Sequence, residues 1–228
     1  MNKPSLPASC LDFMKQLKGN NNREWFALNK DAYLKELAPV ELFAEALLSE
    51  LNTHDVIETP SGKKSLHRIY RDTRFSKDKT PFKTDWSGGF RRATKYRRGG
   101  YYYHFEPGNS FVLCGFWGPN ADDLKRIRQD IAFDAAPLKA ILNDAIFVKT
   151  FGTLQGEQLK TSPKGYQPDH EAIDLLRYKQ FLVTRRFTDE EILRADFFEQ
   201  ACRAFRLMRP FLDYMSEALT TDINGLEV

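Results

Sequence analysis

Residues 101–117 read YYYHFEPGNSFVLCGFW, and their pattern decides the fold class. From Tyr101 to Glu106 the side chains alternate between two sets, which is the period-two pattern of a strand with one face in the core. Phe111 to Trp117 is a second, strongly apolar run, and Trp117 is expected in the core. Pro107-Gly108-Asn109 between the runs is typical of a turn, because proline presets φ and glycine accepts a positive φ. The stretch therefore predicts an antiparallel hairpin.

Further segments are assigned as strands of the same sheet. One strand is predicted to begin near Trp86 and to include Phe90, and the runs Ile146–Phe151 and Gln180–Phe187 are assigned as two others. Arg91–Arg98, with five cations and no acid, is predicted as the loop that leads into the hairpin. Together these segments predict an antiparallel or mixed central sheet.

The first part of the chain is predicted to be helical. Ser9 and Asn21 precede runs with helical spacing, and Asn21 with Glu24 has nearly the spacing of a capping box. Pro39 suits the first turn of a third helix, since its missing N–H is not needed there. The apolar face of that helix has close to 3.6-residue spacing and consists of Val40, Phe43, Ala44, Leu47, Leu48 and Leu51.

The second half of the chain carries its own helix signals. Asn120 is predicted to cap one helix, and a shorter helix is expected from about Ala135 to Asn143. Thr188 and Glu191 have the spacing of a capping box, and Pro210 should kink or split the last helix. No internal repeat and no convincing linker divides the sequence. We therefore predict a single α+β domain over the whole chain, with N- and C-terminal helices flanking the central sheet.

Composition excludes several classes of protein. The 42% hydrophobic and 29% charged residues are those of an ordinary globular protein, neither disordered nor membrane-spanning. No run approaches the roughly 20 apolar residues of a transmembrane helix. The stretch Met1–Pro7 lacks the apolar core of a secretory signal, and Cys10, Cys114 and Cys202 are odd in number and far apart. These features predict a cytoplasmic protein with reduced cysteines and no contact with a membrane.

The net charge of +3 conceals a strong asymmetry. Residues 63–98 carry 13 Lys and Arg against 3 Asp, a local charge of +10, which leaves the rest of the chain at −7. A concentrated basic segment on an acidic body is typical of a local anion-binding surface. A basic loop without a ligand would give the same count, so this alternative stays open.

The densest part of this segment is Arg68–Lys83, RIYRDTRFSKDKTPFK, with six cations against two carboxylates. Apolar side chains interrupt the charges at intervals. Four of them are expected to anchor the segment to the core: Ile69, Tyr70, Phe75 and Phe82. Pro81 holds the end of the stretch extended or turned, because it fixes its own φ and keeps the preceding residue out of the helical region.

Five cations of this block are the candidate anion-binding residues: Arg71, Arg74, Lys77, Lys79 and Lys83. Arginine offers a planar fork to phosphate or carboxylate, and lysine adds a mobile point charge. Asp72 and Asp78 could instead pair with the arginines in a structural salt-bridge network, so both interpretations stay open. Lys164, close to His170 in a segment of turn composition, could complete the same pocket.

His104 and Glu106 are expected on one face of the same strand, because side chains two residues apart point the same way. Such a pair could act as an acid and a base, or supply two ligands to a metal. A metal needs at least a third protein ligand, which the sequence does not place beside them. We therefore take His104, Glu106 and His170 as candidate catalytic residues, and we expect no metal and no cofactor.

Several motifs follow one another along the chain: Asn21–Phe26 (NNREWF), Ile69–Lys83, Tyr102–Gly108, Pro163–Tyr166 and Asp169–His170. In this order they resemble a widespread family of bacterial and fungal proteins, a domain of unknown function. Phe82 stands where that family usually has tyrosine, and Arg91–Arg98 stands where a more neutral, glycine-rich loop is expected. The resemblance implies no established activity, so the chemistry rests on the residues.

Three functions compete for this sequence. The first is a site for an anionic small molecule that bears phosphate or carboxylate, with or without a reaction, and it is favoured by separate basic pieces that could converge with His104. The second is nucleic-acid binding through residues 63–98, favoured by Tyr96 among the cations of Arg91–Arg98. The third is a basic module that meets an acidic protein. The first is our leading hypothesis, while enzymatic activity and oligomeric state stay open.

Overall fold

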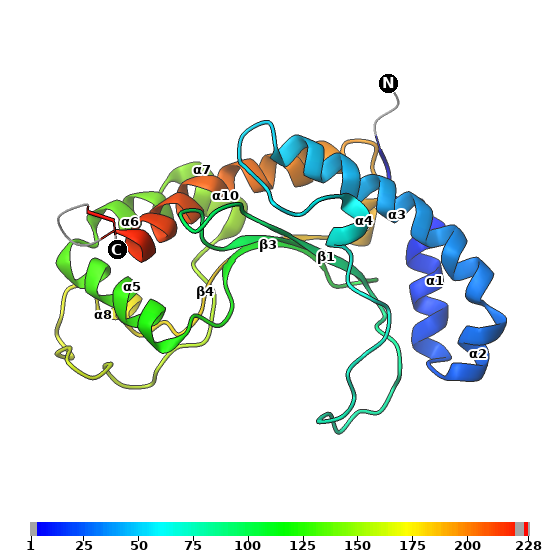
Figure 1. Ribbon diagram of the computed structural model, residues 1–228, viewed down its shortest axis with the longest axis horizontal. Coiled ribbons are helices and arrows are strands. Elements are labelled where there is room, and N and C mark those ends of the chain that lie inside the picture. The colour runs from blue at the N-terminus through cyan, green and yellow to red at the C-terminus, as the bar shows by residue number, and fades with distance from the viewer. Residues whose placement is uncertain (1–3, 222–225, 228) are drawn as a thin grey trace. The chain divides into compact units, whose positions relative to one another are not determined.

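The structure is a computed structural model that describes residues 4–221 and 226–227. Residues 1–3 of the N-terminal stretch noted above lie outside the described residues. One antiparallel sheet, with the strand order β1-β2-β3-β4, forms the centre of the fold (Figure 1). Its strands are β1 (Trp86–Arg91), β2 (Gly100–Phe105), β3 (Ser110–Phe116) and β4 (Phe181–Phe187). The predicted hairpin is therefore confirmed as β2 and β3, and the strands near Trp86 and at Gln180–Phe187 are confirmed as β1 and β4.

Helices flank the sheet in chain order, which confirms the predicted α+β fold class with N- and C-terminal helices. Those before the sheet are α1 (Ala8–Gly19), α2 (Arg23–Leu28), α3 (Lys30–Leu51) and α4 (Gly62–Ser65). Those between β3 and β4 are α5 (Ala121–Phe133), α6 (Ala136–Leu142), α7 (Ala145–Phe151) and α8 (Ile173–Leu176). After β4 come α9 (Asp189–Ile192) and α10 (Phe197–Thr220). Among the helices of the described residues, none is long and apolar enough to cross a membrane.

The chain divides into two compact units, and strands of the sheet contribute to both. The first unit contains the chain up to Phe90, together with Tyr102–Val112 and Arg186–Arg203. The second contains Arg91–Tyr101, Leu113–Arg185 and the chain from Ala204 onward. Each unit has its own buried core, and each is described below by itself.

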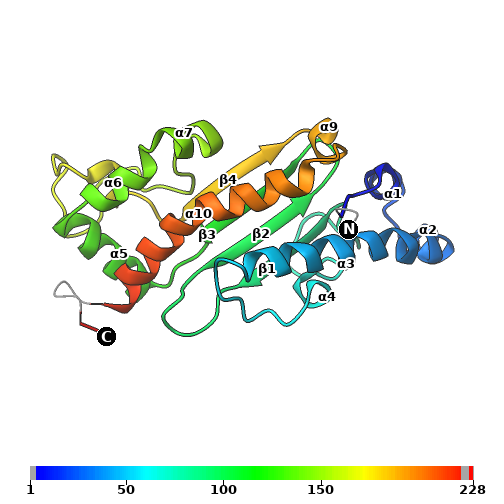
Figure 2. The same cartoon turned by 90° about the horizontal axis from the view of Figure 1, so that it is seen from above.

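The core of the first unit forms where α3 and the start of α10 pack on one face of β2 (Figure 2). Phe43 of α3 and Phe197 of α10 lie 5.6 and 5.5 Å from Phe105 of β2, measured between ring centroids. The two helical rings also stack on each other at 5.4 Å. The apolar face predicted for α3 is buried along its whole length, so this face positions the helix on the sheet.

The core of the second unit is built around α10 and the end of β2 that belongs to this unit. Tyr101 packs edge to face on Phe205 at 5.2 Å. Met208, Phe211 and Met215 of the same helix are fully buried. Their spacing of three to four residues is that of one helix face directed at a core.

The assignment of Ile146–Phe151 as a strand is wrong, because this run forms α7. Asp144 caps the helix, since its Oδ1 accepts the backbone N–H groups of Ile146 and Phe147, both at 2.9 Å. Phe147 and Phe151 are four residues apart, and their rings pack at 4.8 Å on the buried side. A short apolar run fits either structure by composition, and the cap decides for the helix.

The position assigned to Pro39 was also wrong. Pro39 was expected in a first turn, but α3 begins at Lys30 and continues through it. A proline inside a helix costs about 3 kcal/mol, so packing on both sides must offset that cost. Tyr33 stacks on Trp86 at 5.4 Å before Pro39, and Val40 is fully buried after it. Helix α10 likewise continues through Pro210, so this proline does not split the helix, and the kink stays a prediction.

Most of the remaining local signals are confirmed. Asn120 caps α5 by accepting the N–H of Asp123, and Thr188 with Glu191 forms a complete capping box on α9. The cap of α2 is Asn22, one residue later than expected. The prediction that Trp117 lies in the core is wrong, since this residue is 69% exposed. Strand β3 ends one residue before it, at Phe116.

Candidate functional site

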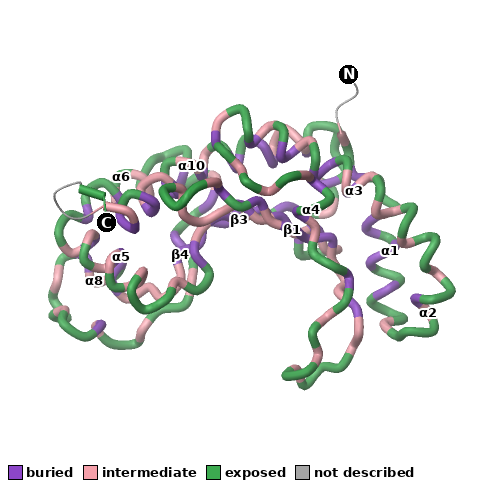
Figure 3. Tube along the Cα trace, in the orientation of Figure 1, coloured by how far each residue is buried: buried purple, intermediate pink, exposed green. Residues whose placement is uncertain are grey.

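The basic loop, residues Arg68–Lys83, joins α4 to β1 in the first unit and extends away from the sheet (Figure 1). Its two arms pair at their base, where Arg71 N donates to Pro81 O at 2.9 Å and Lys83 N donates to Ile69 O at 2.8 Å. These bonds flank an antiparallel bridge between Tyr70 and Phe82. Most of the loop beyond this base is exposed or half-buried (Figure 3).

One asparagine side chain fixes this base to the N-terminal helices. Asn21 Nδ2 donates to Phe82 O at 2.9 Å, and Phe82 N donates to Asn21 Oδ1 at 3.1 Å. We call this pair of bonds the Asn21 clamp. The ring of Phe82 also stacks on Phe26 of α2, with ring centroids 4.1 Å apart. Asn21 and Phe82 are 61 residues apart in sequence, and their contact joins two motifs into one structural element.

Only half of the expected apolar anchors of the basic loop reach a core. Ile69 is 6% exposed and Phe82 is 2% exposed, which confirms both as anchors. Tyr70 is 55% exposed and Phe75 is 95% exposed, so their assignment as anchors is wrong. Phe75 lies beyond the paired base, where its ring contacts the guanidinium of Arg74 at 5.8 Å.

Carboxylates within the basic loop pair with both of its central arginines. Arg71 Nη1 lies 2.5 Å from Asp78 Oδ2, and it also donates to the backbone and side-chain oxygens of Thr80. Arg74 Nη2 lies 2.6 Å from Asp72 Oδ2 on the exposed tip. Hydrogen bonds from the Thr80 backbone N–H and from Arg71 lower the pKa of Asp78 to about 2. Asp78 therefore carries its negative charge at neutral pH and holds Arg71 in place.

A groove of about 400 Å³ runs between α2 and the basic loop, and we call it the α2 groove. Its lining combines cations with aromatic rings and consists of Arg23, Phe26, Ala27, Lys30, Tyr70, Arg71, Thr73, Pro81 and Phe82. No carboxylate belongs to this lining. A second hollow shares Arg23, Thr73 and Pro81 with it and adds Lys79, Asp78 and Asn21.

The cations of the α2 groove differ in how they are held. Arg71 is half-buried and has one edge of its guanidinium bound to Asp78 and Thr80. The side chains of Arg23 and Lys30 form no hydrogen bond or ion pair with any residue in the described part of the chain. The groove thus places two cations without a protein partner beside one that is fixed in position.

The other cations predicted for this site are distributed more widely. Lys79 lines the neighbouring hollow, and its Nζ donates to Thr73 O at 2.8 Å. Lys83 is half-buried and lies close enough to His67 to lower the pKa of that ring, although burial is the larger cause. Arg74 and Lys77 are exposed and do not line the α2 groove.

His104 and Glu106 of the first unit do face one another, as the strand register predicts. His104 Nε2 lies 3.3 Å from Glu106 Oε2, and His104 Nδ1 lies 3.2 Å from the Tyr102 hydroxyl. Asp85 approaches from the side of Nδ1, with its Oδ1 3.6 Å away. The imidazole ring also stacks on Phe111 at 4.8 Å. This arrangement orients the ring firmly between two carboxylates.

The carboxylate of Glu106 has several donors. Burial raises its pKa, but hydrogen bonds from Asn109, His104 and Thr84 outweigh burial and leave the pKa below its usual value. Asp85 and Glu106 approach opposite nitrogens of His104 and so cannot share one ion with it. Among the described residues, no group of three His, Cys, Asp or Glu side chains is arranged to hold a metal.

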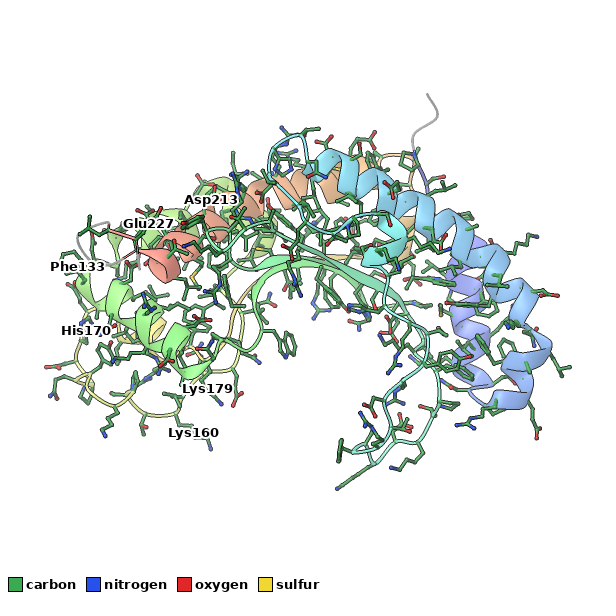
Figure 4. All side chains as sticks on the ribbon, in the orientation of Figure 1. Phe133, Lys160, His170, Lys179, Asp213 and Glu227 are labelled. Atoms are coloured by element: carbon green, nitrogen blue, oxygen red, sulfur yellow. The ribbon has the colours of Figure 1, made fainter. Side chains whose placement is uncertain are left out.

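Lys164 and His170 belong to the second unit, in the segment between α7 and β4 that also carries the labelled Lys160 (Figure 4). Lys164 is exposed, and His170 Nδ1 accepts the backbone N–H of Ala172 at 3.1 Å. The basic loop, His104 and Glu106 belong to the first unit. A pocket shared by these two groups of residues therefore stays a prediction.

Three residues of the α2 groove were not identified from the sequence. Arg23 and Lys30 are single cations in helical segments, and such cations usually lie on solvated surfaces. Tyr70 was expected to be buried. The one signal that could have linked them is the shared resemblance of Asn21–Phe26 and the basic loop, since segments that carry one motif set can be in contact.

A comparison with protein families matches residues 9–214 of this chain to a family described as conserved hypothetical protein DUF2461. The comparisons with curated proteins and with solved structures gave no match. The matched residues include α1 from its second residue, α2 to α9, all four strands, the basic loop and most of α10. The chain therefore belongs to the DUF2461 family of conserved hypothetical proteins.

Proposed function

We propose that the protein binds a small molecule bearing phosphate or carboxylate in the α2 groove. The observation that carries this proposal is a groove lined by Arg23, Lys30 and Arg71 with no carboxylate in its lining. Gathering like charges raises the free energy of the folded state unless an anion neutralises them. A bound anion would supply that neutralisation.

The three cations suit complementary tasks in such a site. Arg71 is pre-oriented by Asp78 and Thr80, so its planar fork loses little freedom when it binds an oxyanion. Arg23 and Lys30 add positive charge from the opposite wall of the groove. The volume of about 400 Å³ lies within the range of roughly 300–1,000 Å³ usual for small-molecule sites.

Nucleic-acid binding draws less support from the structure. That alternative depends on the cations of Arg91–Arg98, and two of these are engaged within the second unit. Arg92 is buried against Asp213, and Arg98 Nη2 lies 2.5 Å from Asp123 Oδ2. Arg23 and Lys30, whose side chains have no partner among the described residues, favour the α2 groove.

The test is thermal unfolding of the wild-type chain with and without millimolar inorganic phosphate. A ligand that binds only the folded state at 100 times its Kd adds about 2.7 kcal/mol, which corresponds to a rise in Tm of about 5–10 °C for a chain of this size. Arg23→Gln should remove most of this rise. Lys77→Gln removes the same charge from an exposed position outside the lining and should retain it.

Absence of any phosphate-dependent rise in the wild-type chain, under conditions where Tm is well defined, would overturn the proposal. Equal losses in Arg23→Gln and Lys77→Gln would also contradict it, because they would reduce the effect to general charge. If Arg71→Gln lowered Tm without ligand and left the phosphate response intact, the arginine would be structural only.

We also propose a cytoplasmic location. All three cysteines are buried and form no disulfide within the described residues, and Cys10 has a pKa raised to about 12 by burial and by Glu36. Thiols of this kind react slowly in the folded chain. Alkylation in denaturant should therefore modify three thiols in protein taken from cells, whereas a disulfide-linked peptide in the mass spectrum would contradict this location.

A further inference from the structure

We infer that the ligand of the α2 groove carries a planar ring beside its anionic group, as a nucleoside monophosphate does. This inference rests on the proposed function and adds the chemical class of the ligand. The observation behind it is Tyr70, which lines the groove and stays 55% exposed next to a cluster of buried aromatic rings.

The ring of Tyr70 is held by its neighbours on one side. It packs against Phe82 with a centroid distance of 5.4 Å and meets the edge of Phe26 at 6.4 Å. Its backbone is fixed by the bridge to Phe82, which the Asn21 clamp holds in turn. A ring positioned in this way can accept a second ring with little loss of conformational freedom.

The cations and the exposed ring belong to one groove. Tyr70 and Arg71 are adjacent in the chain and both line it, and Arg23 with Lys30 line it from the helical side. A ligand that stacks on Tyr70 would place a phosphate attached through a short linker, such as a ribose, among these cations. Stacking and charge would then act on the two ends of one molecule.

Stacking of a base on an aromatic side chain changes affinity by roughly 5- to 150-fold, which corresponds to about 1–3 kcal/mol. The phosphate alone should therefore bind more weakly than a molecule that also offers a ring. AMP and ribose 5-phosphate make a suitable pair for this comparison. They share the sugar and the phosphate monoester, and only AMP has the base.

The experiment is isothermal titration of the wild-type chain with AMP, ribose 5-phosphate and adenosine. AMP should bind about 10- to 100-fold more tightly than ribose 5-phosphate, and adenosine should bind more weakly than AMP. Tyr70→Leu should bring the affinity for AMP down to that for ribose 5-phosphate. Phe75→Leu removes the other exposed ring of the basic loop and should preserve the preference for AMP.

The possible outcomes test separately whether the ligand carries a ring and whether the groove binds its anionic group. Equal affinity of the wild-type chain for AMP and ribose 5-phosphate would overturn the inference that the ligand carries a ring. If Arg23→Gln then lost binding of both compounds, the proposed function would still stand. A preference for AMP that survives in Tyr70→Leu shows that the ring lies elsewhere and overturns the role of Tyr70. If the wild-type chain binds no phosphate compound, both the proposed function and the inference about the ring are wrong.

Discussion

Two basic stretches of this chain have similar composition and opposite structural roles. In the second unit, Arg92 of the Arg91–Arg98 tract is fully buried, where it donates to Leu212 O at 3.0 Å and contacts Asp213 and Ser216. In the first unit, the basic loop contributes Arg71 to the α2 groove and keeps its other cations exposed or half-buried. A count of charges does not distinguish the two. What distinguishes them is where the paired carboxylates come from: Asp213 and Asp123 lie on helices far away in sequence, whereas Asp72 and Asp78 belong to the basic loop itself.

The tract extends this contrast through its other residues. Arg98 lies beside Asp123, and the Tyr96 hydroxyl donates to Glu227 at 3.0 Å. Asp213 and Glu227 are both labelled in Figure 4, on α10 and near the C-terminal end of the described chain. The tract therefore joins parts of the second unit, as an internal tie does. In the basic loop, Arg71 and Arg74 instead pair with carboxylates of the loop itself, Asp78 and Asp72.

The largest expected effect tests the buried side of this comparison. Arg92→Met should destabilise the chain by about 3 kcal/mol, because it removes the hydrogen bonds from the buried guanidinium to Leu212 O and Ser216 Oγ, although Asp213 keeps Arg209 as a donor. Denaturant unfolding of the wild-type chain and of Arg92→Met measures this difference in the free energy of unfolding. Lys77→Met is the matched change in the basic loop and should stay within about 0.5 kcal/mol. Similar losses in both variants would abolish the distinction between the two stretches.

The second effect tests what positions the basic loop. Asn21→Ala removes both bonds of the Asn21 clamp and leaves the half-buried peptide groups of Phe82 unpaired, at a cost of about 2 kcal/mol. The loosened loop should be cut faster by trypsin at Lys77 or Lys79. Asn22→Ala removes the cap of α2 and costs about 1 kcal/mol, but it should not accelerate this cleavage. Equal cleavage rates in both variants would show that the clamp does not hold the loop.

The third effect concerns pH and the ion pair of Arg71. The pKa of Asp78 is about 2 in the folded chain and has its ordinary, higher value in the unfolded chain. Its contribution to stability is therefore present above the ordinary carboxyl pKa and is lost as pH falls toward 2. An NMR titration of the Asp78 carboxyl should show this low pKa. In Arg71→Gln the value should rise only partway, because the largest cause, the Thr80 backbone N–H, remains.

The smallest effect concerns the tip of the basic loop. Phe75→Ser should change the free energy of unfolding by less than about 0.5 kcal/mol, since the ring is 95% exposed. Phe82→Ala, in the same loop, should cost about 3–5 kcal/mol because that ring is buried and stacked. Chemical denaturation of both variants checks the pair. A large loss in Phe75→Ser would mean that the tip packs against something.

Local signals predicted much of the fold, and nonlocal contacts explain the failures. The turn at Gly108 requires a positive φ, and the observed value is 74°. Because glycine adopts such a φ without strain, its presence in the sequence predicts the turn. The strand assigned at Ile146–Phe151 failed because a six-residue run with four apolar side chains fits a strand as well as a buried helix turn. Asp144, which caps the helix, lies just outside that run. Apolar periodicity within the run therefore takes no account of the cap.

The candidate site was predicted only in part for a similar reason. The basic loop was identified from its composition, and Arg71 does line the α2 groove. Arg23 and Lys30 come from helical segments about 40 residues earlier in the chain, so no spacing rule connects them to Arg71. Their approach depends on the contact between Asn21 and Phe82, which are 61 residues apart.

The Asn21 clamp also makes the occupancy of the α2 groove observable at a single amide. The N–H of Phe82 donates to Asn21 Oδ1, so its hydrogen exchanges with solvent only when the two walls of the groove separate. A ligand that contacts both walls would hold them together and slow this exchange in proportion to its occupancy. The exchange rate of one backbone proton would thus report the fraction of chains with bound ligand, even where the ligand itself gives no signal.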